Sequence, residues 1–403
     1  MKWGVLGFIL LSSISLCAQK NSVSGIVLDE ETKQPVPFAN VFFANTTIGV
    51  SSDQDGKFQL AGFASGKYDL IVTFVGYTNF QRSLEFDNSN LHVSIGLVQT
   101  PIVLSEVVIR EDTTDRTRNL LIYKRYFLGE ATNSKRCKII NSDVIHLFFD
   151  TQTKVLVAHA KGPIQIENNA LGYRLNYYLY TFELDLNSGR LTSFGVPSFQ
   201  NLQAGNQSQA NRWNKERQRA YYGSMNHFIR AFRSDQLKQE GFEVKRLYQV
   251  ANRERPPQHI LDAKIKEFRF KADGDKVKNV NSDSLSFYRK LNSLPVLVDS
   301  LANKDILASE LLTDDKHIRY KGRLSVIYKK ELEEKGYLNA VGRTLQSRQS
   351  SVIHFLSDSL RLYPNGYYED QKSIFIENYW AWSEKISDYL PNDYQPVKKR
   401  KNK

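Results

Sequence analysis

The sequence predicts an all-β sandwich followed by a mixed α+β domain with an antiparallel sheet. Short β-rich runs follow one another closely in residues 20–110, without a helical period. A polar linker at residues 111–117 marks a domain boundary, and the region 118–396 mixes helical spacing with strand-like runs. With 403 residues, 41 % of them hydrophobic, the chain is long enough for two to three packed domains.

Residues 1–18 have the pattern of a secretory signal peptide. Lys2 precedes an apolar run from Trp3 to Leu11, and the small residue Ala18 offers a cleavage site. Lipidation at Cys17 is the alternative, but a lipobox has a small residue before the cysteine and here that residue is Leu16. We therefore expect an exported protein in the periplasm, at the outer membrane or at the cell surface.

The composition excludes several classes of protein. Two Cys are too few for a disulfide scaffold or a Cys-rich zinc module, and the apolar content excludes wholesale disorder. The net charge is +12, but nucleic acid is not an expected partner of an exported chain. Cys137 is expected to be a buried structural thiol, because no histidine that would activate it is identifiable from the sequence.

Turn residues separate the runs in the first region. Asp53, Asp55 and Gly56 are predicted to form a hairpin turn, in which both carboxylates cap backbone amides and Gly56 takes a positive φ. Ser65-Gly66-Lys67 is predicted to close a second hairpin. The expected strands are Val23–Leu28, Phe38–Ala44, Gly49–Ser52, Lys57–Leu60, Tyr68–Val75, Phe80–Phe86, Leu91–Leu97 and Ile102–Ile109.

Five segments of residues 20–110 also resemble a known family. They are Val23-Ser24-Gly25-Ile26-Val27, Pro35 to Val41, Gly49 to Phe58, Gly66-Lys67-Tyr68 and Phe74-Val75-Gly76-Tyr77. In this order they resemble the carboxypeptidase-like regulatory domain, a transthyretin-like sandwich of Bacteroidetes envelope proteins. The remainder of the chain resembles the second region of proteins that carry the same module and for which no activity is established. The resemblance therefore implies a fold and an envelope location, but no mechanism.

The resemblance does not bring a metal site with it. In zinc carboxypeptidases the ligands beside this module include a His-x-x-Glu pair, and none of the seven His has Glu three residues later. The Asp53 turn echoes a calcium loop, but the twelfth position counted from Asp53 is Ala64 rather than Glu. We therefore expect no cofactor and no metal.

The region 118–396 is expected to be one α+β domain. Periodicity predicts a helix at Leu120–Leu128, antiparallel strands within residues 144–186, and one long helix from Ser208 to Gln239. Further strands are predicted at Lys264–Phe270 and Ile318–Tyr328, a charged helix at Lys330–Lys335, and a hairpin turn at Pro364-Asn365-Gly366.

Three features of this region could contact ligands. The long helix is strongly basic, which fits either an anionic lipid or glycan, or a solvated outer face; its cations are Arg212, Lys215, Arg217, Arg219, Arg230 and Arg233. Tyr379, Trp380 and Trp382, with Tyr367, could stack on sugar rings, with Trp380 and Trp382 on one face of a strand, or could line a core. The basic tail at residues 397–403 is expected to be disordered, and it could lie on an anionic membrane surface or serve as a solubilising tail.

Known hydrolase motifs are missing from the sequence, which contains no Gly-x-Ser-x-Gly elbow and no phosphate-binding loop. We therefore expect a non-enzymatic envelope protein, with the sandwich as an interaction module and the α+β domain contacting a protein or glycan. The alternative is an exported hydrolase with an unrecognised active site in residues 118–396. Its candidate polar groups are His146, His159, Glu167 and His227, provided that they converge in one pocket.

Overall fold

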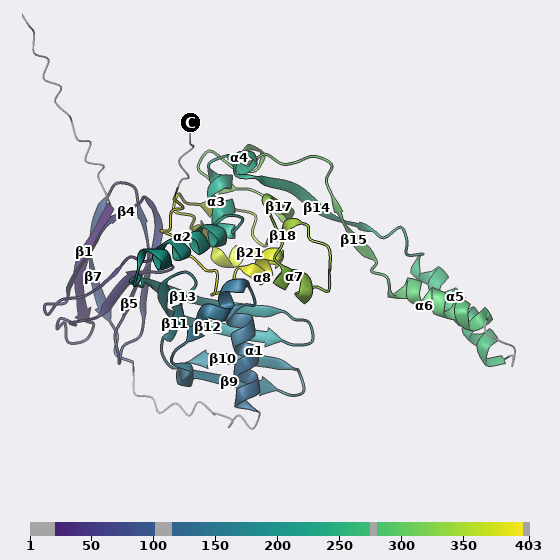
Figure 1. Ribbon diagram of the computed structural model, residues 1–403, viewed down its shortest axis with the longest axis horizontal. Coiled ribbons are helices and arrows are strands. Elements are labelled where there is room, and N and C mark those ends of the chain that lie inside the picture. The colour runs from purple at the N-terminus through teal and green to yellow at the C-terminus, as the bar shows by residue number, and fades with distance from the viewer. Residues whose placement is uncertain (1–20, 101–114, 275–279, 398–403) are drawn as a thin grey trace, which may run out of the picture.

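The computed structural model describes residues 21–100, 115–274 and 280–397, and it describes no side chain of residues 270–282. The predicted signal peptide at 1–18, the predicted strand at Ile102–Ile109 and almost all of the basic tail lie outside the described residues. Figure 1 shows three bodies of β-structure and one projecting helical hairpin.

Residues 21–97 fold into the predicted β-sandwich. Strand β1 alternates between buried and half-buried side chains along its whole length, which places one of its faces in the core. It lies between β4 and β7 in a three-stranded sheet, and the second sheet has the order β3-β2-β5-β6. The strands are β1 (Asn21–Asp29), β2 (Asn40–Phe43), β3 (Gly49–Ser51), β4 (Lys57–Phe63), β5 (Gly66–Thr73), β6 (Phe80–Phe86) and β7 (Asn90–Leu97).

The second body is a six-stranded antiparallel sheet covered by helix α1 (Arg116–Leu128). Asp115 caps this helix by accepting a hydrogen bond from the backbone N–H of Arg118 at 3.1 Å. Tyr123 and Phe127 of α1 are buried against the sheet, where their rings pack on Phe182 and Tyr177. The strands are β8 (Cys137–Ile139), β9 (Ile145–Asp150), β10 (Val155–Ala160), β11 (Ile164–Asn168), β12 (Tyr173–Asp185) and β13 (Leu191–Asn201).

The third body has its own apolar core, built around a five-stranded sheet of order β15-β14-β17-β18-β21. A small sheet of order β16-β19-β20 lies beside it. Its strands are β14 (Phe242–Ala251), β15 (Leu297–Leu301), β16 (His317–Ile318), β17 (Gly322–Leu332), β18 (Arg348–Phe355), β19 (Leu360–Leu362), β20 (Tyr368–Glu369) and β21 (Ile374–Asn378). Its helices are α3 (Met225–Arg233), α4 (Leu237–Glu240), α7 (Lys335–Ala340) and α8 (Tyr379–Ser383). Helix α2 (Gln207–Tyr221), which leads into α3, packs on the second body through Trp213 and Tyr221.

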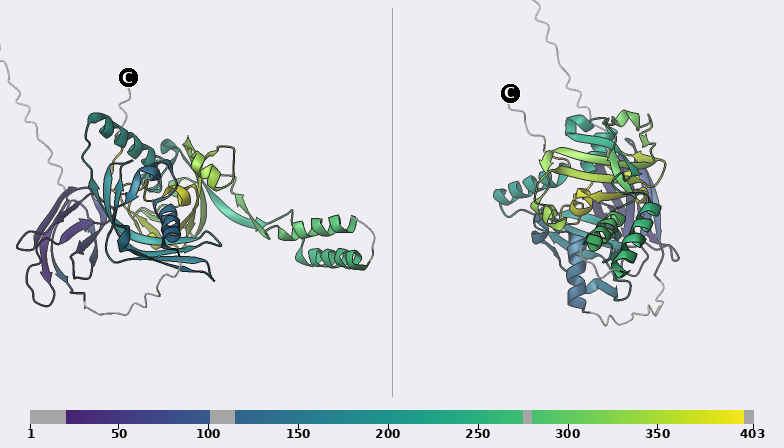
Figure 2. Two further views of the ribbon diagram at one scale, coloured as in Figure 1. Left: turned by 60° about the horizontal axis from the view of Figure 1, so that its bottom comes forward. Right: turned by 90° about the vertical axis from the view of Figure 1, so that its right-hand side faces the viewer.

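A long arm projects from this third body. Strands β14 and β15 leave the sheet as a two-stranded ribbon, and the ribbon ends in helices α5 (Gln258–Gly274) and α6 (Val280–Ser293). Figure 1 and the left-hand view of Figure 2 show these helices projecting away from the rest of the protein. We call residues 248–301 the arm. Among the described residues, no helix is long and apolar enough to cross a membrane.

Several predicted elements are corrected by the structure. The predicted helix Ser208–Gln239 is three helices, because the chain breaks twice. The first break is at Gly223, whose φ is +82° and whose carbonyl oxygen accepts the indole N–H of Trp380, and the second is at Asp235, whose φ is +55°. The predicted strand Lys264–Phe270 is wrong, because these residues lie in helix α5, where Phe268 stacks on Tyr288 of helix α6. The predicted helix at Lys330–Lys335 is wrong, since residues 330–332 extend strand β17 and α7 starts only at Lys335.

The turns of the sandwich are also corrected. β3 and β4 belong to different sheets, and so do β4 and β5, so the turns at Asp53–Gly56 and Ser65–Lys67 cross between the sheets rather than close hairpins. The hairpin turn at Pro364–Gly366 is confirmed, because β19 and β20 pair antiparallel on its two sides.

Candidate functional site

The four aromatic residues considered for ligand stacking do not share a surface. Trp380 and Tyr379 are 2 % and 4 % exposed, so they belong to the protein interior. Residues 379–383 form helix α8 rather than a strand, which separates Trp380 from Trp382 by about 200° around the axis. Tyr367 lies elsewhere, with its hydroxyl donating to Asp69 Oδ2 at 3.0 Å. The four residues therefore form no common stacking platform, since Trp380 and Tyr379 belong to the interior whereas Tyr367 lines a cavity described below.

The turn residues of the sandwich act locally. Asp53 Oδ1 accepts hydrogen bonds from the backbone N–H groups of Asp55 and Lys57, and Gly56 has a φ of +74°. The Asp55 carboxylate does not cap an amide as expected but pairs with the Lys57 amine at 3.2 Å. Gly56 also needs to be glycine for space, since a Cβ there would lie 2.5 Å from the carbonyl oxygen of Val27.

The polar residues named for the hydrolase alternative do not converge. His146 and His159 lie opposite each other on β9 and β10, whereas Glu167 is on β11, on the other end of the sheet, and pairs with Arg174. His227 is buried in the third body, where its Nδ1 accepts the backbone N–H of Gly223 and its Nε2 lies 3.1 Å from Glu240. A hydrolase built on these four residues has no common pocket.

The basic face of the predicted long helix is mostly structural. The Arg217 guanidinium stacks on the Tyr173 ring at 4.0 Å and donates to the carbonyl oxygens of Leu171 and Gly172. Arg230 donates in the same way to three backbone carbonyl groups, which belong to Asn365, Asn392 and Tyr394. These side chains tie loops together, so neither the lipid-binding nor the solvated-face interpretation applies to them.

The sandwich is docked on the second body through its second sheet. Phe42 of β2 stacks on Tyr178 of β12 with ring centroids 5.6 Å apart, and Val196 of β13 completes a small apolar cluster between the two bodies. The loop after β2 continues the pairing, because Thr46 forms a parallel bridge with Ser198. Apolar contact and backbone pairing together fix the sandwich in place.

A second set of contacts joins the sandwich to residues 361–394. Asp393 accepts hydrogen bonds from both the backbone N–H and the hydroxyl of Thr47. Nearby, the hydroxyl of Tyr389 donates to Asn45 Oδ1 at 2.9 Å. Further along the seam, Asn365 donates to the Lys67 carbonyl oxygen, Lys67 pairs with Glu369, and Arg361 forms a bidentate pair with Glu85.

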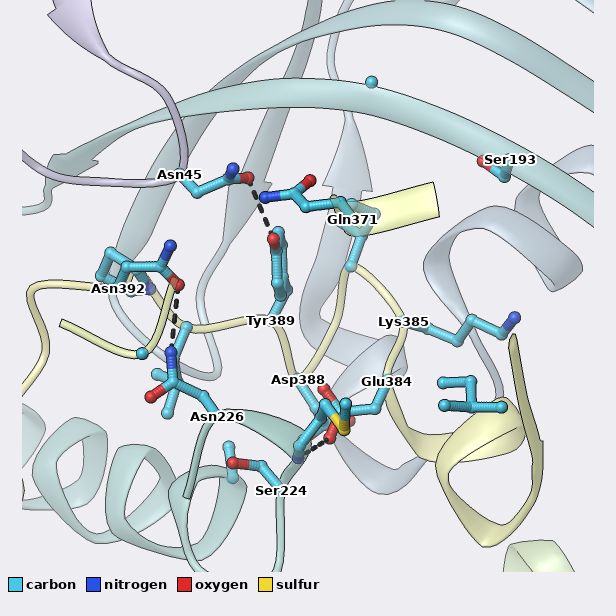
Figure 3. A pocket seen from close by; sticks show the side chains of 18 of the residues that line it. Asn45, Ser193, Ser224, Asn226, Gln371, Glu384, Lys385, Asp388, Tyr389 and Asn392 are labelled. Carbon is cyan, nitrogen blue, oxygen red and sulfur yellow. Dashed lines mark hydrogen bonds between the residues drawn. The ribbon is translucent and has the colours of Figure 1, made fainter. Parts of the chain in front are cut away.

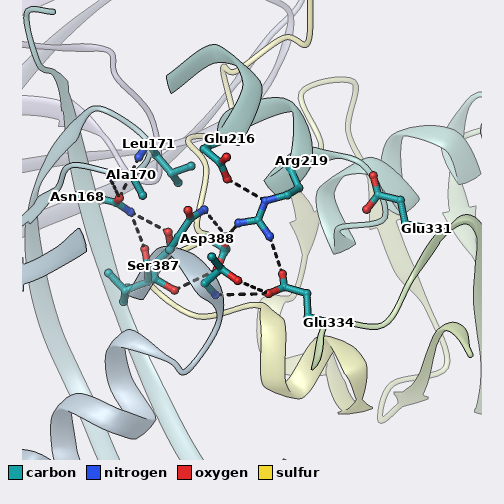
Figure 4. A network of polar contacts seen from close by, with 12 residues as sticks. Asn168, Ala170, Leu171, Glu216, Arg219, Glu331, Glu334, Ser387 and Asp388 are labelled. Carbon is teal, nitrogen blue, oxygen red and sulfur yellow. Dashed lines mark hydrogen bonds and ion pairs between the residues drawn. The ribbon is translucent and has the colours of Figure 1, made fainter. Parts of the chain in front are cut away.

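A network of acids around one arginine lies between the second and third bodies (Figure 4). Arg219 of α2 pairs with Glu216 at 2.9 Å, with Glu334 at 2.7 Å and with Asp388 at 3.7 Å. Asp388 has a second partner in Asn133, whose amide donates to Asp388 Oδ1 at 2.8 Å. We call these residues the acid network.

A cavity of about 370 Å³ lies where the three bodies meet, and Figure 3 shows residues from all of them around it. We call it the central cavity. A second void of about 380 Å³ lies on the acid-network side, and Glu384 and Asp388 line both spaces. The polar groups that line the central cavity are mostly uncharged; they are Asn45, Ser193, Ser224, Asn226, Gln371 and Asn392, with the phenols Tyr126, Tyr177, Tyr221, Tyr367, Tyr368, Tyr389 and Tyr394.

The charged groups of the cavity wall are half-buried, and this partial burial shifts their ionisation. Glu384 Oε1 accepts the backbone N–H of Met225 at 2.9 Å, and burial raises the pKa of Glu384 to about 7. Burial likewise raises the pKa of Asp388 to about 6 and lowers the pKa of Lys385 to about 8. Sequence reasoning missed these residues, because two acids four positions apart beside one lysine are a common pattern with no motif value.

The arm presents a different kind of surface. Among its described side chains only Leu261 is buried, although Phe268 and Tyr288 stack between α5 and α6 at 5.6 Å. Large apolar side chains are exposed along the ribbon and the helices; they are Tyr248, Val250, Ile260, Phe287, Val296, Leu297 and Leu301. Isolated exposed apolar residues are ordinary, but so many on one extended element point to an interaction surface.

In the described part of the chain, no group of three or more His, Cys, Asp or Glu side chains is arranged to hold a metal ion. Comparison with known families identifies the first body: residues 23–109 match the CarboxypepD_reg-like domain, which confirms the predicted resemblance for this segment. No curated protein matches the chain by sequence.

Solved structures show limited similarity. The backbone protein of the group B streptococcus pilus 2b is 14 % identical with a TM-score of 0.18, over 20 % of this chain and 41 % of that chain. The shaft pilin SpaA from Lactobacillus rhamnosus GG is 19 % identical with a TM-score of 0.18, over 21 % and 49 %. A cohesin–X-dockerin complex from Acetivibrio cellulolyticus is 16 % identical with a TM-score of 0.19, over 28 % and 79 %. The chain thus spans less than half the length of these pilins, and TM-scores this low give no basis for a function.

Proposed function

We propose that the chain is an exported protein of the cell envelope that binds another envelope protein through the arm. The observation that carries this proposal is the projection of α5 and α6 away from the body with most of their apolar side chains half-buried or exposed. A pair of helices without a third packing layer gains little stability of its own in water. A partner that covers this surface supplies the missing layer.

The charges of the arm favour an acidic partner. Lys264 and Glu267 neutralise each other within α5. Over the described side chains of residues 253–293, the Lys and Arg are Arg253, Arg255, Lys264, Lys266, Arg269, Arg289 and Lys290, and the acids are Glu254, Asp262, Glu267 and Asp283. These cations outnumber the acids by seven to four, and the same segment exposes Phe287 and Ile260, so the complementary surface is a protein with an apolar centre and an acidic rim.

The sandwich is attached to the other two bodies, so together they form the rigid part from which the arm projects. Because β2 stacks on β12 and residues 389–393 bond the loop after β2, the sandwich moves with the rest and does not act as a free spacer. In this proposal the body holds the arm at a defined distance and orientation from the envelope component to which the protein belongs.

Site-specific photo-crosslinking in cells tests the proposal. A photoreactive phenylalanine analogue replaces Phe287 on the arm or, as the control, Leu345, which is 84 % exposed outside the arm. We expect a discrete protein adduct from position 287 only, located in the envelope fraction and lost in the double variant Lys266→Glu/Arg289→Glu. Equal adducts from both positions, insensitivity to charge reversal, a lipid adduct, or retention of the chain in the cytoplasm would contradict the proposal.

A further inference from the structure

We infer that the central cavity is a binding site for a neutral saccharide of one or two rings. This inference does not depend on the arm, because the cavity lies between the three bodies and the arm contributes no residue to its lining. Its volume of about 370 Å³ is at the small end of the range of about 300–1,000 Å³ that is typical of small-molecule sites.

The lining is suited to hydroxyl groups. Each saccharide hydroxyl both donates and accepts hydrogen bonds, and amide side chains offer both functions in one group. Asn45, Asn226, Gln371 and Asn392 supply four such groups, the first from the sandwich and the others from residues 226–392. Three of these amides already bond within the protein, but an apolar ligand would leave the buried Asn226 Oδ1 without a partner, which is costly once water is expelled.

One amide already has a free acceptor. Asn226 Nδ2 donates to Asn392 Oδ1 at 3.0 Å, so its orientation is fixed, and its Oδ1 is buried without a partner among the described residues. Space beside this oxygen is kept by Gly366, since a Cβ there would lie 2.8 Å from Asn226 Oδ1. A buried acceptor in a roomy polar cavity is a place for a ligand hydroxyl.

Aromatic rings provide the second half of saccharide recognition. Tyr389 and Tyr177 line the same cavity, and the hydroxyl of Tyr389 is already used by Asn45, which fixes the ring. Rings held in this way offer flat apolar faces to the C–H faces of a sugar, while their hydroxyl groups stay at the edge.

The charges of the wall disfavour an ionic ligand. The positive Lys385 is adjacent in sequence to Glu384, and Asp388 is the other acid of the wall. A charged ligand of either sign would lose its hydration on entering and would meet a like charge beside each opposite one, so the wall does not offset the desolvation cost. A ligand without charge avoids both costs.

Isothermal titration of the mature full-length chain tests the inference. The probes are neutral mono- and disaccharides, with glucose, N-acetylglucosamine, lactose and cellobiose in the first set, and glucuronate and glucosamine as charged comparisons. We expect at least one neutral probe to bind, and the charged comparisons to bind at least tenfold more weakly than their neutral counterparts.

Two matched variants locate the binding. Ser193 lines the cavity and is exposed, so it lies where the cavity meets solvent, and Thr192 is the exposed neighbour on the same strand outside the lining. We expect Ser193→Trp to weaken binding at least tenfold and Thr192→Trp to leave it unchanged, with unfolding temperatures equal for both. Asn226→Leu provides a second cavity variant with the same expectation. No binding by any probe, a preference for charged probes, or equal binding by Ser193→Trp and Thr192→Trp would overturn the inference, whatever the crosslinking at the arm shows.

Discussion

Thr47 and Asp393, which are 346 residues apart, form a paired contact in which one carboxylate accepts both the backbone N–H and the hydroxyl of the threonine. A carboxylate that satisfies two donors at a partly buried seam stabilises the contact more than an exposed ion pair does. The sandwich and the rest of the protein are therefore joined by specific chemistry and not only by a linker.

We expect Asp393→Ala to lower the free energy of unfolding by about 1–3 kcal/mol, because both Thr47 donors lose their acceptor. Urea titration followed by far-UV circular dichroism measures the change. Asp55→Ala is the control, since Asp55 is exposed and pairs only with Lys57, and we expect it to change the free energy by less than about 0.5 kcal/mol. Equal effects of the two variants would show that the seam contributes no stability.

Arg219 is expected to be the most sensitive charged residue of the interior. Arg219→Met leaves Glu216, Glu334 and Asp388 close together without a cation, which we expect to lower the free energy of unfolding by about 3 kcal/mol at pH 8. The loss should shrink by half or more at pH 5, because burial raises the pKa of Asp388 to about 6 and this carboxyl group is then mostly protonated. Thermal unfolding at both pH values measures this, and a loss independent of pH would mean that the arginine acts through packing alone.

The half-buried groups of the cavity wall predict an unusual pH profile of stability. With pKa values of about 7 and about 6, Glu384 and Asp388 bind protons more tightly in the folded state than in the unfolded chain. The free energy of unfolding therefore falls as the pH rises from about 4 to about 7. The pKa of Lys385, lowered to about 8, has the opposite effect, because the unfolded chain binds more protons above that pH. We expect a minimum of stability near pH 7–8.

The variant Glu384→Gln measures how much of this pH dependence comes from Glu384 rather than from other titrating groups. The glutamine amide oxygen still accepts the Met225 N–H, but it does not titrate. Denaturant titrations at intervals between pH 4 and 8 should show a smaller decline for the variant than for the parent. Identical declines would show that Glu384 does not contribute to the pH dependence.

Cys137 should be inert in the folded protein. The thiol is buried, and burial raises its pKa to about 12, so almost none of it is thiolate at neutral pH. We expect a thiol reagent such as Ellman's reagent to react at least a hundredfold more slowly with the native chain than with the chain in 6 M guanidinium, allowing for the reagent's own response to denaturant. Fast reaction under native conditions would contradict the burial.

Local patterns predicted the sandwich well but placed its turns less well. Alternation along Val23–Leu28 and the turn residues at Asp53–Gly56 are properties of short segments, so they can be read without knowing the fold. Which sheet a strand joins depends on contacts far away in the sequence, and this is why turns that cross between the sheets were expected to be hairpins. The same limit explains the arm, since charged residues between Lys264 and Phe268 fit a strand or a helix equally well.

The candidate sites could not be predicted from the sequence for a related reason. Asn45, Asn226 and Asn392 are ordinary polar residues until the fold brings them to one cavity. Trp380 and Trp382 attracted attention as a motif, but a helix that starts at Tyr379 turns them apart and buries Trp380 in the core. An aromatic residue in the sequence predicts that its ring packs against something, but only its position in the fold decides whether that contact is a protein core or a ligand.

The contact between the first body and residues 389–393 also constrains the order of biogenesis. A ribosome completes the sandwich long before it makes Tyr389 and Asp393, so the first module emerges without the residues that will secure it. In the proposed export, the chain crosses its membrane in the same direction, and the seam can close only after nearly all of the chain has arrived. The contact between the sandwich and residues 389–393 therefore forms at the end of folding. Truncated translation products lack these residues, so they expose the uncovered surface of the sandwich to quality-control proteases.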